Sequence, residues 1–242
     1  MRIELNCDAG EGQDGLAAGQ DAALIPLVSA VNVACGAHAG DVATIRQTIE
    51  LARQAGAAVG AHPSYPDRAG FGRHHLEMTP AALEESLVEQ VRAVAAAARE
   101  LGCRLRHVKV HGALYNEAAI DAALAEVVVR AIARASAASF VVGPPGSRLL
   151  EAAQAADLPT MAEGFADRAY EPDGTLRSRA LPGAVHSDPR VAARQAVDLA
   201  ADGRVQTICI HGDTPGAAAI AGAVRAALVA AGHDVPGGTP TA

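Results

Sequence analysis

The sequence predicts an α/β fold in which parallel strands and crossover helices form a single-domain (β/α)7 TIM-like barrel. Seven short apolar runs alternate with helical patterns from end to end, as βα units do around a parallel sheet. The runs are almost wholly apolar, as expected for parallel strands covered on both faces. The length of 242 residues is close to the roughly 250 residues of a (β/α)8 barrel. A doubly wound open sheet fits the same alternation, but seven units at this length favour an incomplete barrel.

The strands are predicted from short stretches of β-branched and apolar residues. The last of them, "TICI", runs directly into the polar stretch "HGDTPG". Each run has only three to six residues, a length typical of strands rather than of helices. The predicted strands are residues 3–7, 30–34, 57–61, 105–110, 140–142, 160–162 and 207–210.

The helices are predicted from capping residues and from apolar residues at helical spacing. Asp41 is a favourable N-cap for one helix. Pro80 suits the first position of another, and Gly102 follows its end. The predicted helices are residues 21–28, 41–54, 81–101, 120–135, 147–156, 189–201 and 215–231. No linker divides the chain, so residues 1–242 are expected to form one domain, with a frayed tail at 236–242.

Composition and charge argue against several classes of protein. The formal charge of −7 comes without the basic stripe that a nucleic-acid surface needs. The chain has neither the pattern of a signal peptide nor an apolar stretch that would span a bilayer. The four cysteines show no CxxC spacing, which argues against a zinc ribbon or a thioredoxin motif. We therefore expect a cytoplasmic protein that binds neither nucleic acid nor membranes.

Polar and ionisable residues gather at the carboxyl ends of the predicted strands. These ends meet at one face of a parallel sheet, and ligands bind there. Helix capping does not explain histidine after four separate strands, because it favours Ser, Thr, Asp and Asn. The residues expected at this face are Asn6, Asp8, Asn32, His38, His62, Lys109, His111, Glu163, Arg168, His211 and Asp213. The other histidines are interpreted as surface or loop residues: His74, His75, His107, His186 and His233.

Two long loops follow strand ends on the same face. They span residues 62–78 and 164–188, and long loops within a compact domain commonly act as lids or binding segments. Arginine pairs well with carboxylates and phosphates, so these loops predict an anionic ligand. They contain five arginines: Arg68, Arg73, Arg168, Arg177 and Arg179.

Six stretches of the sequence together resemble the LamB/YcsF family. They are "LNCDAGEG", "VNVACGAHAGD", "GAHPSYPDRAGFGR", "VKVHGALYN", "EGFADRAYEPDGTLRSR" and "ICIHGDTPGA", in the order of the family, from Leu5 to Ala217. The chain departs from the family pattern at Ala37, Val110 and His74, where an aromatic residue, a proline and a second arginine are usual. The resemblance implies a (β/α)7 barrel related to glycoside hydrolases and polysaccharide deacetylases. It also implies the A subunit of an ATP-dependent 5-oxoprolinase, which opens the lactam of 5-oxoproline (pyroglutamate) to L-glutamate with partner subunits B and C.

Opening a lactam requires an activated carbonyl, a nucleophilic water and a proton for the leaving nitrogen. Asp8 and Asp213 are candidates for a base or an orienting carboxylate, and His62 and His111 for proton transfer. Lys109 is a candidate for stabilising an oxyanion or a phosphate. The candidates for substrate binding are Asn6, Asn32, His38, Arg73, Glu163, Arg168 and His211. For the two asparagines, hydrogen bonding between neighbouring strand ends is an equally good interpretation.

The sequence does not place the nucleotide. It lacks the Walker A pattern GxxxxGK[ST]. Glycine-containing turns at 143–147 and 212–216 precede predicted helices, whose N-termini attract phosphate. The same turns are also ordinary connections between a strand and a helix. ATP therefore binds either to this chain or to the partner subunits, and both alternatives stay open.

Two other functions fit the same residues. The first is a metal-dependent amide hydrolase, such as a deacetylase. Related barrels hold a divalent ion with one Asp and two His, and Asp8, His62 and His111 form such a set. The second is a non-catalytic subunit that binds a small acid and carries it to a partner.

Overall fold

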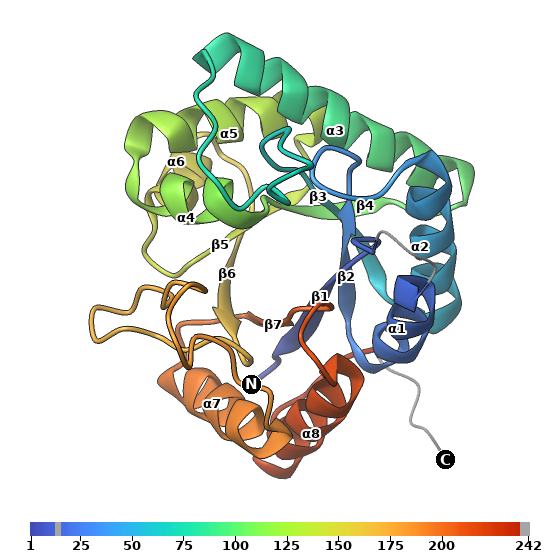
Figure 1. The fold of residues 1–242 in the computed structure, drawn as a ribbon, viewed down its shortest axis with the longest axis vertical. Coiled ribbons are helices and arrows are strands. Elements are labelled where there is room, and N and C mark those ends of the chain that lie inside the picture. Colours follow the sequence, from blue (N-terminus) through green and yellow to red (C-terminus); the bar gives the residue numbers. More distant parts are fainter. Residues whose placement is uncertain (13–15, 238–242) are drawn as a thin grey trace.

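Seven parallel strands form a closed barrel in the computed structural model, which describes residues 1–12 and 16–237 (Figure 1). The strands follow one another around the barrel in sequence order, and the last pairs with the first through Glu4–Thr207 and Cys7–Ile210. The predicted fold class is therefore confirmed. The strands are β1 (Glu4–Ala9), β2 (Ala30–Ala34), β3 (Ala58–His62), β4 (Leu105–Lys109), β5 (Phe140–Gly143), β6 (Thr160–Phe165) and β7 (Thr207–Ile210).

Helices surround the barrel and begin largely where the capping residues predict. Asp41 accepts a hydrogen bond from the Thr44 amide (2.8 Å), and Asp121 caps a further helix at Ala123 and Leu124. The helices are α1 (Leu16–Leu24), the 3-10 turn η1 (Ile25–Leu27), α2 (Val42–Ala55), α3 (Pro80–Glu100), α4 (Gly112–Ile120), α5 (Ala122–Ser136), α6 (Arg148–Ala155), α7 (Pro189–Asp202) and α8 (Ala217–Ala230). Among the described residues, no helix combines the length and apolar character needed to cross a membrane.

Two strands, β1 and β6, extend two or more residues beyond their predicted ends, and the difference places site residues within the barrel. β1 continues to Ala9 and β6 to Phe165, because polar side chains there find partners inside the barrel. Asp8 therefore lies in a strand rather than after it, and so does Glu163. Glu163 accepts a hydrogen bond from Asn6 of β1 (2.8 Å), which lies across β7. An apolar pattern stops at the first polar residue, so it predicts an end that is too early for such strands.

The helical predictions differ from the structure in two places. The segment before β2 forms α1 and then η1, rather than one helix over 21–28, and Pro26 lies at the start of η1. The second difference is α4, which the sequence analysis does not predict. Glycine and asparagine interrupt its apolar pattern, and Asp121 separates it from α5.

His107 lies inside the barrel, so its interpretation as a surface or loop residue is wrong. Its side chain is buried on β4 against Gly60 of β3, where a Cβ atom would overlap the imidazole ring. Its Nε2 atom lies 2.6 Å from Asn32 Oδ1. Burial, reinforced by Arg106 and Lys109, lowers the pKa of His107 to about 3, so the ring is neutral. The histidine thus fills the barrel beneath the polar face.

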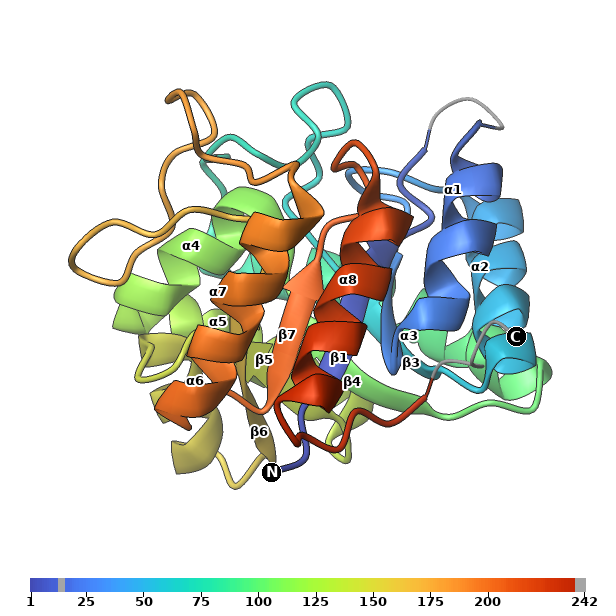
Figure 2. The same ribbon diagram turned by 90° about the horizontal axis from the view of Figure 1, so that it is seen from below.

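The long loops after β3 and β6 project from the same end of the barrel (Figure 2). The loop after β6 is partly ordered by antiparallel bridges between Arg168 and Val185 and between Tyr170 and Leu176. At the other end of the chain, Arg225 donates hydrogen bonds to the carbonyl groups of Val235, Pro236 and Gly237. The start of the predicted frayed tail is therefore held in place, and residues 238–242 lie outside the described part.

Candidate active site

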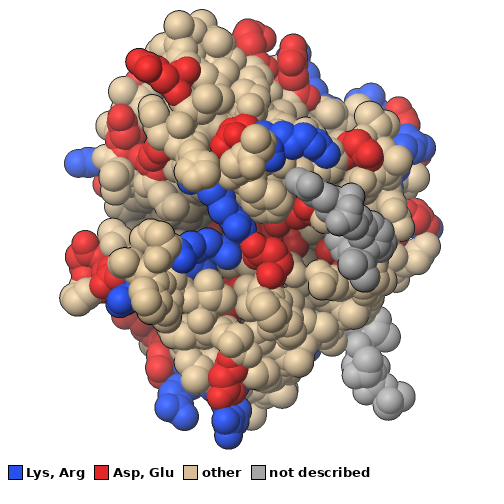
Figure 3. Space-filling view, in the orientation of Figure 1, with Lys and Arg blue, Asp and Glu red and all other residues tan. Residues whose placement is uncertain are grey.

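A cavity of about 660 Å³ opens at the carboxyl ends of the strands. Figure 3 shows a hollow in the centre of this face, bordered by basic (blue) and acidic (red) side chains. Seven of the predicted site residues line the cavity: Asp8, His62, Arg73, Lys109, His111, Arg168 and His211. Five strands or the loops after them supply these residues. The convergence expected from parallel strand ends is therefore present.

Lys109 is the cationic centre of the site. Its Nζ atom lies 3.1 Å from Asp8 Oδ1, 3.0 Å from Glu163 Oε1 and 3.0 Å from Cys209 Sγ. Burial opposes the charge of the ammonium group, but Asp8, Cys209 and Glu163 raise the pKa of Lys109 well above its usual value. Burial likewise opposes the charge of Asp8, but His62 and Lys109 hold its pKa well below the usual value. Lysine and aspartate therefore form a charged pair at the bottom of the cavity.

Asn6 and Asn32 lie beneath this pair and do not line the cavity. Asn6 Nδ2 donates to Glu163 (2.8 Å), and Asn32 Nδ2 donates to both Asn6 Oδ1 and Asp8 Oδ1 (2.7 Å each). His107 Nε2 bonds to the side-chain oxygen of Asn32, Oδ1. Both amides thus donate to carboxylates inside the barrel. This fits hydrogen bonding between neighbouring strand ends better than direct substrate binding.

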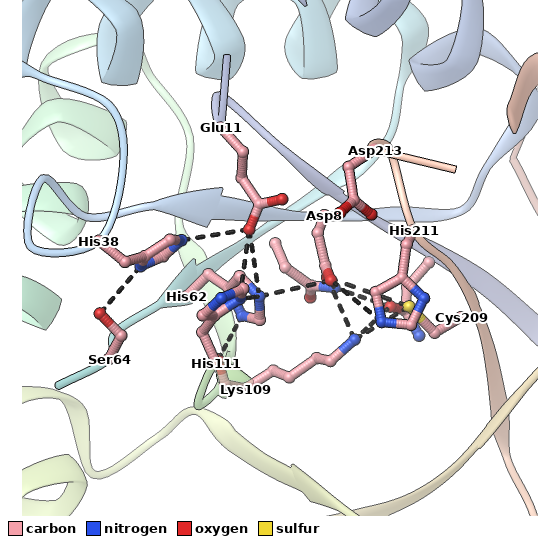
Figure 4. Close-up of polar contacts among 12 residues, drawn as sticks. Asp8, Glu11, His38, His62, Ser64, Lys109, His111, Cys209, His211 and Asp213 are labelled. Carbon is pink, nitrogen blue, oxygen red and sulfur yellow. Dashed lines mark hydrogen bonds and ion pairs between the residues drawn. The ribbon is translucent and has the colours of Figure 1, made fainter. Parts of the chain in front are cut away.

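Two imidazoles and two carboxylates meet beside Lys109 (Figure 4). His62 Nδ1 bonds to the carbonyl oxygen of Lys109 (2.7 Å), and His111 Nε2 bonds to that of Phe71 (2.9 Å). A carbonyl oxygen only accepts, so each of these nitrogens carries its proton. The other nitrogens, His62 Nε2 and His111 Nδ1, then face one another at 3.0 Å.

Carboxylate oxygens border the same point. Asp8 Oδ2 lies 3.4 Å from His62 Nε2, and Glu11 Oε1 lies 3.3 Å from His111 Nδ1. Ligand atoms of all four residues lie within 4.8 Å of one another. With both rings neutral, four lone-pair atoms converge without a hydrogen between them. Such a cluster requires a cation, which can be a proton on one imidazole or a metal ion.

Glu11 is a site residue that the sequence analysis does not select. It lies within the stretch "LNCDAGEG" but beyond the end of β1. Gly10, with a φ of 76°, turns the chain so that Glu11 returns over the barrel mouth. His38 bonds to Glu11 through Nε2 (3.1 Å) and to Ser64 through Nδ1 (2.9 Å), and its ring stacks on that of His111. His38 thus supports the cluster from behind rather than lining the cavity.

His211 belongs to a second group, centred on Asp167. Asp167 lies 2.9 Å from His211 Nδ1 and also accepts from the His211 amide (3.1 Å) and from the Thr214 hydroxyl (2.5 Å). His211 therefore turns Nε2 toward Asp8 Oδ2, at 3.9 Å. Asp167 is not among the site residues predicted from the sequence, although it directly precedes the predicted residue Arg168. An acidic residue directly before a selected arginine, in a loop that follows a strand, is the sequence signal that points to Asp167.

Asp213 lies at the rim rather than beside Asp8. It forms ion pairs with Arg73 and with Arg179 (3.5 Å), and its side chain is 31% exposed. This position does not favour the predicted role as a base, because the two arginines hold the Asp213 carboxylate outside the cavity that Asp8 and Lys109 line. Arg68 lies apart from the cavity, where it donates to the carbonyl oxygens of Gly36 and Gly40. Arg68 therefore holds the loop after β2.

The fold and the site define a class: a (β/α)7-barrel protein with a cluster of ionisable side chains at the end of the barrel where barrel enzymes carry out their chemistry. The chain belongs to the LamB/YcsF family, whose model matches residues 3–240. It is 48% identical to the A subunit of the 5-oxoprolinase of Chloroflexus aggregans, over 97% of this chain and 98% of that one. It is 44% identical to the A subunit of the 5-oxoprolinase of Heliobacterium modesticaldum, over 98% of both chains.

Two solved structures resemble the chain to different degrees. The lactam utilization protein of Thermus thermophilus superposes with a TM-score of 0.89 at 38% identity, over 97% of this chain and 99% of that one. A carbohydrate esterase of family 4 from Streptomyces lividans superposes with a TM-score of 0.52 at 13% identity, over 97% of this chain and 91% of that one. The second likeness shows the shared barrel fold alone.

Proposed function

We propose that this chain is the A subunit of a 5-oxoprolinase and takes part in hydrolysing the lactam of 5-oxoproline to L-glutamate. The names of its relatives and of the Thermus structure support this substrate. The observation that carries the proposal is the convergence of Asp8, His62, Lys109 and His111 in one cavity. A stable amide needs groups that activate water, stabilise negative charge and deliver a proton, and these side chains supply all three.

The roles follow from the contacts of each group. Asp8, held as a carboxylate by Lys109 and His62, is positioned to orient or activate a water molecule. Lys109 offers a buried positive charge to the oxyanion that forms at the lactam carbonyl. His62 and His111 share one hydrogen-bonded contact and are positioned to pass a proton to the leaving nitrogen. His211, oriented by Asp167, borders the same carboxylate.

The dependence on ATP and on partner subunits B and C is part of the proposal. The relatives are named as one lettered subunit of a 5-oxoprolinase, which supports the presence of partners. The sequence lacks a Walker A pattern, which supports a nucleotide site on a partner. The overall reaction then consumes 5-oxoproline, ATP and two molecules of water, and it yields glutamate, ADP and phosphate.

A metal-dependent amide hydrolase is the second candidate, because four lone-pair atoms converge within the barrel mouth. Asp8, Glu11, His62 and His111 would hold a divalent ion. Each imidazole already bonds through its other nitrogen to a backbone carbonyl, as metal-ligating histidines commonly do. A bound ion would supply an activated water or polarise the carbonyl. Stoichiometric metal in protein purified without chelators, with amide hydrolysis in the absence of ATP, would favour this candidate.

Reconstitution tests the main proposal. The chain is mixed with its B and C subunits, and glutamate formed from 5-oxoproline is measured with and without ATP. We expect glutamate only in the complete mixture with ATP. Asp8→Asn should abolish it, whereas Asp202→Asn, an exposed control on α7, should leave it unchanged. Full turnover by Asp8→Asn would support a non-catalytic subunit that only binds the small acid.

A further inference from the structure

Tyr115 lines the cavity, but none of the roles proposed above uses it. It lies near the start of α4, and it is only 4% exposed. Its ring packs edge-on against that of Phe165, with the ring centres 5.6 Å apart. Its hydroxyl group is buried and has no hydrogen-bond partner among residues 1–12 and 16–237. A buried tyrosine hydroxyl group usually has a partner, so an acceptor is expected close to it.

Glu163 supplies an atom that matches this hydroxyl group. Both contacts of its carboxylate run through Oε1, which lies 3.0 Å from Lys109 Nζ and accepts from Asn6 Nδ2 at 2.8 Å. The other oxygen, Oε2, is buried and also lacks a partner in the described part of the chain. Burial, and then the charge of Glu163, raise the pKa of the Tyr115 phenol well above its usual value, as expected for close neighbours. A donor without an acceptor thus lies near an acceptor without a donor.

The Glu163 carboxylate is one of the groups that fix the position of Lys109. An ammonium group has three protons, and Nζ has three close neighbours: Asp8 Oδ1 (3.1 Å), Glu163 Oε1 (3.0 Å) and Cys209 Sγ (3.0 Å). Burial raises the pKa of the Cys209 thiol well above its usual value, so its sulfur is neutral and a weak acceptor. The two carboxylates therefore hold the ammonium group, and any movement of Glu163 moves Lys109.

We propose that Tyr115 is a positioning residue, whose hydroxyl group donates to Glu163 Oε2 and so fixes the carboxylate that holds Lys109. The inference rests on the proposed function and adds a residue to its site. A small side-chain movement closes this bond and satisfies both buried atoms at once. A hydrogen bond to a carboxylate is charge-assisted, so it is stronger than one between neutral groups. Because Glu163 does not line the cavity and the Tyr115 hydroxyl group is buried, the pair acts on the substrate only through Lys109.

Tyr115→Phe removes the hydroxyl group alone, and the complex of this chain with its B and C subunits tests the effect. We expect kcat for glutamate formation to fall at least about tenfold, as for other residues that orient a reacting group. KM for 5-oxoproline should stay within about twofold, because no substrate contact is lost. Tyr65→Phe is the matched control, since Tyr65 is also buried and donates to a glutamate, Glu117 (2.7 Å), away from the cavity. It should leave both constants unchanged.

A double variant tests whether the hydroxyl group acts through Glu163. In the Glu163→Gln background, Tyr115→Phe should lower kcat by no more than about twofold, because the charge that the hydroxyl group holds in place is already gone. A further tenfold loss in that background, or a raised KM with unchanged kcat, would assign Tyr115 to another role and overturn the inference.

Magnetic resonance of the isolated chain tests the effect on Lys109 without the partner subunits. Lys109 is the only lysine in the sequence, so isotope-labelled lysine gives one ammonium signal. At a fixed pH, Tyr115→Phe should speed the exchange of these protons with water at least about tenfold, and Tyr65→Phe should not.

Unchanged exchange together with unchanged kcat would overturn the inference. Loss of the folded circular dichroism spectrum in Tyr115→Phe would also overturn it, because the hydroxyl group would then serve the fold. A wild-type complex that forms no glutamate, beside a Tyr115→Phe chain with faster exchange, would refute the proposed function and leave the link from Tyr115 to Lys109 standing.

Discussion

Replacing Lys109 by methionine should lower the stability of the fold strongly, because it leaves two buried carboxylates without their positively charged partner. Asp8 and Glu163 each lie within about 3 Å of the ammonium group, at 3.1 and 3.0 Å, and both are 2% exposed. Removing one partner of a buried ion pair costs about 3–5 kcal/mol, since the remaining charge is neither solvated nor paired. We therefore expect Lys109→Met to lose about 3–5 kcal/mol of unfolding free energy at pH 8.

The loss should depend on pH in a defined direction. In the variant, Asp8 loses Lys109, one of the two groups that hold its pKa well below the usual value, while burial still opposes its charge. Asp8 in the folded variant therefore binds a proton at a higher pH than in the wild type, which relieves part of the cost as the pH falls. The deficit relative to the wild type should therefore be smaller at pH 5 than at pH 8.

Urea unfolding followed by circular dichroism measures both effects, using protein dialysed against EDTA to remove bound metal. The double variant Lys109→Met/Glu163→Gln is the internal control, because it removes one of the two stranded charges. It should recover part of the lost stability at pH 8. A single variant within about 1 kcal/mol of the wild type at pH 8, or a deficit that grows toward pH 5, would refute the reasoning.

The remaining predictions concern other groups. Burial raises the pKa of Asp21 to about 6, so the stability of the wild type falls as the pH rises from about 4 to 6. The Asp21→Asn variant should therefore be up to about 2 kcal/mol more stable than the wild type at pH 7, and equally stable at pH 4. Urea unfolding at the two pH values measures the difference. Asp167→Asn, which misorients His211, should lower glutamate formation by the complex at least about tenfold while the circular dichroism spectrum is kept. Gly60→Ala should cost about 1–3 kcal/mol in thermal unfolding, because its methyl group meets His107, and adding His107→Ala should relieve the strain.

The sequence predicts the barrel and most of the cavity lining for one physical reason. Parallel strands end on the same side, so Asp8, His62, His111 and His211 must converge wherever the sheet closes. Strand parity would have added His107, because it lies two residues before Lys109 on β4 and alternate residues share a face.

Other residues depend on the path of loops, which no local pattern records. Glu11 reaches the site because Gly10 turns the chain back over the barrel. Asp213 lies at the rim of the cavity, because two arginines from other loops pair with its carboxylate there. The sequence shows which residues follow a strand, but a loop's direction is decided by contacts that form only after folding.

Lys109 is the one lysine among 242 residues, and it lies buried at the bottom of the cavity. A protonated, enclosed amine does not react with acylating reagents, so in the folded protein these should label little besides the N-terminal amine. Any opening of the barrel mouth would expose a single new reactive amine at a known place. The rate at which residue 109 is acylated, measured by mass spectrometry of its peptides, would then report how often Lys109 is exposed to solvent, with no engineered probe.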